Sequence, residues 1–89
     1  MTEGSRRLEV RALEVVLKGG SPWGFSLKGG AEIRSALTVS KVEPDGKANG
    51  LLEAGDILLS INDVHCRSRA EAIQLVKSAF NTLTLTVWR

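Results

Sequence analysis

GGSPWGFSLKGG, residues 19–30, is a glycine- and proline-rich loop that runs directly into a strand. Trp23, Phe25 and Leu27 alternate with small or polar residues, which is the period of a β-strand. Gly24 has no Cβ, so another group can approach its backbone closely. Successive N–H groups in such a turn can form a concave anion site, and apolar side chains beside it would line a pocket. A peptide C-terminus presents a carboxylate and an apolar side chain, which such an anion site and pocket would fit. A glycine-rich hairpin loop before a core strand, without any binding role, has the same sequence pattern.

Further strands and one clear helix are predicted around this stretch. Apolar alternation predicts strands over residues 13–18, 37–42, 56–62, 64–66 and 83–88. A phase change near Ala12 predicts a bulge or break there. Residues 47–52 have the pattern of one short helical turn, weakened by Gly50, and residues 69–80 have the strongest helical repeat.

The long helix has a recognisable start. Ser68 is a candidate N-cap and Glu71 lies three residues later, which is the spacing of a capping box. With helices this few, the sheet cannot be covered on both faces. We therefore expect an α+β fold: a small, mostly antiparallel, five- to six-stranded, partly open barrel or sandwich, capped by one long and one short helix.

Length and composition set further bounds. The chain has 89 residues, a net charge of +2 and one cysteine. This length allows one domain, which we assign to residues 8–89 after a flexible lead over residues 1–7. One cysteine excludes a disulfide scaffold, and the lead has no apolar segment typical of a secretory signal. The small charge surplus, without a basic stripe, gives no indication of nucleic-acid binding.

Catalytic and cofactor motifs are not found in the sequence. His65 and Cys66 are adjacent, so in a strand they point to opposite faces and cannot readily pair as base and nucleophile. Two neighbouring ligands do not make a metal site, and the glycine spacings match no phosphate-binding motif. We expect a protein that is not an enzyme and has neither cofactor nor metal.

Several separated motifs resemble those of PDZ domains. Residues 22–27, PWGFSL, resemble the carboxylate-binding loop of that family. Residues 42–48 resemble the turn into its first short helix, and residues 51–62 resemble its most recognisable internal block. Residues 71–77 resemble its second helix. The PWGF form, the following LKGG and the ending LTLTVWR are most similar to the PDZ domains of Shroom, synaptopodin/myopodin and ALP–Enigma proteins. Residues 68–72 and 76–78 favour the Shroom type.

The resemblance implies a groove between the strand at residues 25–28 and the helix at residues 69–79, in which a partner's C-terminal peptide adds as an extra strand. The implied site residues fall into three groups. The carboxylate would be held by the backbone of Trp23, Gly24 and Phe25, with Lys18 assisting through water. The pocket for the terminal side chain would be lined by Trp23, Phe25, Leu27, Ile73 and Val76. Specificity would depend on Arg69 and Ser26. Lys18 is equally well explained as a solvated charge at a strand end.

The chain departs from the family pattern at Arg69. PDZ domains that prefer Ser or Thr two residues before the peptide terminus usually have His there, so that preference is not implied. The connections at residues 47–55 and 66–69 are also short.

The expected partner is the C-terminal peptide of a membrane or cytoskeletal protein with an apolar last residue, bound by a monomer. The expected location is the cytoplasm, at the cytoskeleton or a membrane junction. The alternative is a scaffold surface on the same fold that binds an internal motif, or makes a weak acidic-lipid contact with a phosphoinositide through Lys18, Lys28, Arg67 and Arg69.

Overall fold

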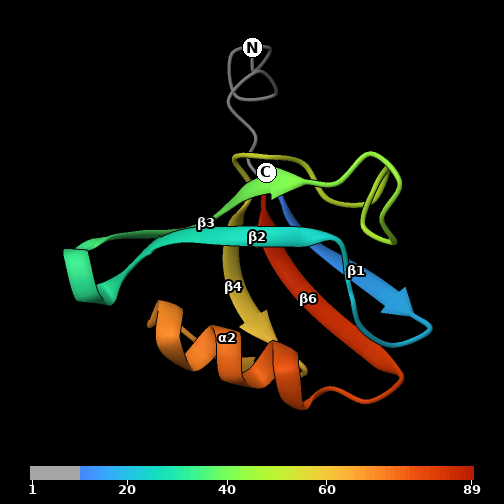
Figure 1. Cartoon of the computed structure of the whole chain (residues 1–89). Coiled ribbons are helices and arrows are strands. Elements are labelled where there is room, and N and C mark those ends of the chain that lie inside the picture. The colour runs from blue at the N-terminus through green and yellow to red at the C-terminus, as the bar shows by residue number, and fades with distance from the viewer. Residues whose placement is uncertain (1–10) are drawn as a thin grey trace, which may run out of the picture.

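The computed structural model describes residues 11–89 as one antiparallel sheet with a single α-helix beside it (Figure 1). The elements are β1 (Ala12–Lys18), β2 (Phe25–Gly30), the 3-10 turn η1 (Ala31–Ile33), β3 (Ser35–Val42), β4 (Ile57–Ile61), β5 (Val64–His65), α2 (Arg69–Ser78) and β6 (Thr82–Trp88). The sheet order is β1-β6-β4-β3-β2, with β5 paired to β4. The predicted α+β class with six strands is confirmed. The predicted lead, residues 1–7, lies outside the described residues.

The core is built from buried side chains of β1, β3, β4 and β6, with others from the loops and from α2. Leu83, Leu85 and Val87 of β6 are fully buried because alternate side chains of a strand point to the same face. Leu83 and Leu85 lie opposite Leu17 and Val15 of β1. Helix α2 buries only Ala72 completely. The larger apolar side chains of this helix, Ile73, Leu75 and Val76, are only partly buried.

Strand β2 is the last strand in the sheet order, so within residues 11–89 one of its edges pairs with no other strand. Figure 1 shows α2 running alongside β2, with the start of the helix near η1 and its end near the loop between β1 and β2. This arrangement leaves a strand edge facing a helix, which is the geometry that positions the site.

The predicted short helix at residues 47–52 is wrong. The carbonyl of Ala48 accepts hydrogen bonds at 2.9 Å from the N–H groups of both Leu51 and Leu52, but the chain does not continue as a helix. Gly50 takes a φ of +85°, which no right-handed helix accommodates. The short helical element is η1 instead, in a segment whose sequence has no apolar repeat.

Several predicted element boundaries also differ from the structure by a few residues. The long helix ends at Ser78, and Phe80, predicted to continue its apolar face, is 85% exposed. The second strand begins at Phe25, so the buried Trp23 precedes it. The first strand begins at Ala12, where the phase of the sequence changes. The earlier part of that alternation, at residues 8–10, lies outside the described residues.

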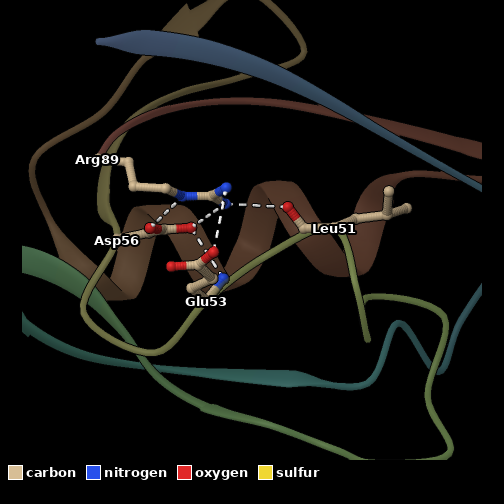
Figure 2. A network of polar contacts seen from close by, with 4 residues as sticks. All are labelled: Leu51, Glu53, Asp56 and Arg89. Atoms are coloured by element: carbon tan, nitrogen blue, oxygen red, sulfur yellow. Dashed lines mark hydrogen bonds and ion pairs between the residues drawn. The ribbon is translucent and has the colours of Figure 1, made fainter. Parts of the chain in front are cut away.

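A polar network joins the end of β6 to the loop before β4 (Figure 2). The Arg89 guanidinium donates to both carboxylate oxygens of Asp56, from Nε at 2.9 Å and from Nη2 at 2.7 Å, and Nη2 also donates to the carbonyl of Leu51 at 3.0 Å. Burial alone would raise the pKa of Asp56, which is 2% exposed. The hydrogen bonds from Arg89 and from the backbone N–H of Glu53, with the Arg89 charge, outweigh burial and lower that pKa.

Candidate functional site

Two adjoining pockets follow the gap between β2 and α2. The loop pocket, of about 360 Å³, is lined by Ser21, Pro22, Trp23, Gly24, Phe25, Glu43, Val76 and Lys77. The helix pocket, of about 340 Å³, is lined by Phe25, Ser26, Leu27, Arg69, Ile73, Val76 and Lys77. Phe25, Val76 and Lys77 line both, so the two pockets form one continuous groove.

The chain's own turn fixes the loop at the head of the groove. A Cβ on Gly24 would lie 2.8 Å from Cα of Gly46, and Gly24 has a φ of +84°. The Gly24 carbonyl accepts a hydrogen bond at 2.8 Å from the N–H of Glu43, and Lys47 Nζ donates to the carbonyl of Pro22 at 3.2 Å. The group that approaches Gly24 closely is therefore the backbone of Gly46, and the loop is held in place before any ligand arrives.

Backbone donors remain free at this loop. Among the hydrogen bonds of residues 11–89, none uses the N–H of Trp23 or Gly24 as its donor. Consecutive free N–H groups in a turn with a left-handed residue form an anion-binding concavity. The loop pocket can therefore accept a carboxylate.

Trp23 forms the buried wall of the loop pocket. Its side chain is 4% exposed and belongs to the core, and its Nε1 has no hydrogen-bond partner. Burying a donor without a partner costs about 1–3 kcal/mol. The indole therefore packs against the core and forms one wall of the pocket, while its buried N–H, which has no partner, lowers the stability of the domain.

One face of α2 forms the opposite wall. Arg69, Ile73, Val76 and Lys77 are spaced at i, i+4, i+7 and i+8, which aligns them along one side of a helix. Arg69 is exposed, and within residues 11–89 its side chain makes no ion pair. The groove is therefore apolar in its middle and has a cation at each end of the helix.

Glu32 of η1 caps the start of this helix. Its carboxylate accepts hydrogen bonds at 2.9 Å from the N–H groups of Arg69 and Ala70 and from the hydroxyl of Ser68. The bonds from Ala70, then Arg69, lower the pKa of Glu32 to about 2. The N–H of Ala31 also donates to the carbonyl of Arg67 at 2.8 Å. We call these contacts the clasp; they tie the end of β2 to the start of α2.

The structure brings most of the predicted site residues together. Trp23, Gly24 and Phe25 line the loop pocket, and Phe25, Leu27, Ile73 and Val76 line the helix pocket with Arg69 and Ser26. Trp23 does not line the helix pocket, and Lys18, exposed at the end of β1, lines neither pocket. Sequence reasoning missed Lys77, although its helical spacing from Ile73 would have indicated it. It also missed Glu43 and Glu32, whose positions depend on contacts far along the chain.

His65 and Cys66 lie outside the groove. His65 is exposed, and Cys66 is 2% exposed, with its thiol donating to the carbonyl of Ser68 at 3.5 Å. Burial raises the pKa of the Cys66 thiol, so the unreactive protonated form is favoured. Residues 11–89 contain no group of three or more His, Cys, Asp or Glu side chains that could hold a metal ion. Across the same residues, no helix has the length and apolar character that crossing a membrane requires.

Comparison with known proteins agrees with this geometry. The PDZ domain family model matches residues 13–88. The chain is 52% identical over 81 residues to Protein Shroom3 of Homo sapiens, which covers 86% of this chain and 4% of that protein. It is 49% identical over 79 residues to Synaptopodin 2-like protein of Homo sapiens, an alignment that covers 84% of this chain and 8% of that protein. It is 38% identical over 80 residues to PDZ and LIM domain protein 1 of Bos taurus, an alignment that covers 86% of this chain and 24% of that protein.

The chain spans less than a tenth of the length of its Shroom and synaptopodin relatives. The match nevertheless covers most of the described sheet and helix, and the relatives include the Shroom proteins that residues 68–72 and 76–78 favour. The chain therefore belongs to the PDZ domain family of protein-interaction modules and is similar to the PDZ domains of Shroom proteins.

Proposed function

We propose that this domain is a non-catalytic module that binds the C-terminal peptide of a partner protein by strand addition. The observation that carries the proposal is the continuous groove between the free edge of β2 and the apolar face of α2. An extended peptide can pair with an unoccupied strand edge through its backbone, while pockets beside the strand select alternate side chains.

The terminal carboxylate would occupy the loop pocket, where the N–H groups of Trp23 and Gly24 are free. The side chain of the last ligand residue would enter the helix pocket beside Leu27, Ile73 and Val76. Burying one Val, Ile, Leu or Phe side chain there contributes about 1.5–3 kcal/mol. The ligand should therefore end in an apolar residue.

Two cations flank the bound peptide in this arrangement. Lys77 lines both pockets and replaces Lys18 as the lysine that attracts the carboxylate. Arg69, at the other end of the helix face, would lie beside the ligand residue two before the terminus. A guanidinium pairs with carboxylates but cannot accept a hydrogen bond from a hydroxyl. Acidic residues at that ligand position should therefore be favoured over Ser or Thr.

The test compares two forms of one peptide, which is selected from a random C-terminal display library. The peptide is synthesised as the free acid and as the C-terminal amide, and the affinity of the domain for each form is measured. Isothermal titration should give a micromolar dissociation constant for the acid, about −7 to −8 kcal/mol, because a short added strand must offset its own ordering entropy. The amide should bind at least tenfold more weakly. Equal affinity of the two forms would exclude the carboxylate site.

The relatives support a setting for this activity. From the similarity to Shroom and synaptopodin-like proteins, we propose that the domain belongs to a cytoskeletal scaffold in the cytoplasm, at the cytoskeleton or a membrane junction. The phosphoinositide alternative has less support, because Lys18, Lys28, Arg67 and Arg69 do not line a common pocket.

A further inference from the structure

A third cavity lies away from the groove, where β3 separates from β4. Strand β3 pairs with β4 at Thr38 and Ile57, and β5 pairs with the far end of β4. The space between, of about 520 Å³, is lined by residues 35–37, 57–59 and 65–67 with Ala31 and Arg34. It shares no residue with the loop pocket or the helix pocket. We call it the β3–β4 cavity; its volume is within the range of about 300–1,000 Å³ typical of ligand sites.

The lining of the β3–β4 cavity combines an apolar floor with a cationic rim. Leu37 and Leu58 are each 3% exposed, and Ile57 at the edge is 37% exposed. The only charged or titratable side chains of the lining, apart from the buried Cys66 thiol, are those of Arg34, His65 and Arg67, and no carboxylate lines the cavity. Within residues 11–89 these three side chains make no hydrogen bond or ion pair.

The acidic side chains of Glu32 and Glu71 do not line this cavity. Glu32 lies between Ala31 and Arg34 in sequence, but its carboxylate is held by the N–H groups at the start of α2. The charges of Glu71 and Glu32 do reach Cys66, where they add to the effect of burial in raising its thiol pKa, but neither residue lines the cavity.

The clasp also fixes the two cationic segments relative to each other. The hydrogen bond from Ala31 N–H to the Arg67 carbonyl joins the segment that carries Arg34 to the segment that carries Arg67. Arg34 itself has a φ of 54°, in the left-handed region that side chains other than Gly, Asn and Asp rarely adopt. An arginine is thus held, against its backbone preference, at the rim of a pre-formed cavity, and glycine at this position would suit the backbone better.

We propose that the β3–β4 cavity is a second binding site, for an acidic polypeptide segment that carries one large apolar side chain. The apolar side chain occupies the floor at Leu37 and Leu58, and flanking carboxylates pair with Arg34 and Arg67. A polypeptide is favoured over a membrane because attraction to anionic lipid grows with the number of basic residues, and this rim carries only two arginines. The site is independent of the carboxylate loop, so it needs no free C-terminus.

The test uses the pentapeptide acetyl-Glu-Glu-Phe-Glu-Glu-amide, whose amidated end removes the terminal carboxylate. In a ¹⁵N-labelled chain, the amide signals of residues 35–37, 57–59 and 65–67 should shift in a saturable manner. Arg34→Gly should keep the dispersed spectrum of the fold and weaken binding at least threefold. Arg34→Gly combined with Arg67→Gln should weaken it at least tenfold, and replacing the peptide's Phe by Ala should do the same.

Lys18→Gln is the matched control, because it removes one exposed cation that does not line the cavity. It should change the affinity less than twofold. An equal loss of peptide affinity in Lys18→Gln and Arg34→Gly would mean that binding is general charge attraction, and it would overturn the proposal. Peptide-induced shifts of amide signals only in the groove between β2 and α2 would overturn it as well. Sedimentation with phosphatidylserine–phosphatidylcholine vesicles completes the test: binding to vesicles that depends on Arg34 and Arg67, without peptide-induced shifts, would also overturn it.

Discussion

The carboxylate of Glu32 accepts a hydrogen bond at 2.9 Å from the backbone N–H of Arg69, 37 positions further along the chain. The bond joins the turn after β2 to the first residue of α2, and with the other contacts of the clasp it sets the separation of the two groove walls at that end. The carboxylate also occupies the positive end of the helix dipole, where a negative charge is favourable.

Glu32→Gln should destabilise the domain at neutral pH, because an amide lacks the charge that the helix start favours. The pKa of Glu32 is lowered to about 2 from 4.5, so its stabilisation is present above about pH 4.5 and is lost as the pH falls toward 2. Urea unfolding between pH 2 and 7 should show the two proteins converging at the acid end. A stability difference that does not change over this range would show that the charge has no part in the clasp.

Asp56→Asn should cost about 2 kcal/mol, because it leaves the Arg89 guanidinium with a neutral partner in a partly buried position. The pKa of Asp56 is lowered, so its contribution is present above the unfolded value of about 4 and is lost as the pH falls below it. Chemical denaturation at pH 7 measures the effect. Lys41→Gln, which removes one member of an exposed pair with Glu43, is the control and should change stability by less than about 0.5 kcal/mol.

Gly24→Ala and Gly50→Ala form a matched pair. Both glycines have φ near +85°, so alanine costs about 1–2 kcal/mol at either position. At Gly50 no atom lies within 4 Å of the added Cβ, whereas at Gly24 the Cβ would lie 2.8 Å from Cα of Gly46. Gly24→Ala should therefore be the more destabilising in thermal unfolding and should also weaken peptide binding. Equal losses of stability would mean that the loop can move away from Gly46.

Trp23→Phe should change the free energy of unfolding by less than about 1 kcal/mol. It removes packing volume, but it also removes a buried N–H that has no partner. Trp23→Ala, which leaves a cavity in the core, should cost about 3–5 kcal/mol. Unfolding followed by far-ultraviolet circular dichroism separates the two. A loss as large in Trp23→Phe as in Trp23→Ala would mean that the indole N–H is satisfied.

Replacing Arg69 should change the preference for the ligand residue two before the terminus. The wild type should favour Asp or Glu by less than about 1 kcal/mol, since the site is exposed to solvent. Arg69→His should move the preference toward Ser or Thr, and Arg69→Glu should repel acidic ligands. Matched peptides are titrated against all three proteins at low and moderate salt. The same rank order in each would show that Arg69 does not select the ligand.

Local patterns in the sequence were sufficient for most of the sheet and for the start of the helix. Alternation predicted β6 closely, and the capping motif was right in that Ser68 Oγ accepts from the N–H of Glu71 at 3.2 Å. Local pattern failed at residues 47–52, where the left-handed Gly50 overrides helical spacing.

Contacts between distant segments could not be read in this way. Glu32 stands in a polar stretch whose spacing contains no sign that it caps a helix 37 residues later. The β3–β4 cavity likewise depends on where two strands separate, which is a property of the sheet and not of either strand alone. Lys77 differs from these, because the repeat that predicted Ile73 and Val76 also includes its position.

The free edge of β2, which we propose as the peptide site, is also a surface on which other copies of the chain could stack into fibres. The pairing of β2 with β3 shifts register twice, between Ser26 and Leu27 and between Lys28 and Gly30, so the edge is neither long nor flat. Lys28 adds an exposed charge, which repels an identical strand. The irregularity of this strand thus disfavours pairing with a second copy of the chain, while a segment of the edge long enough to pair with a short peptide remains.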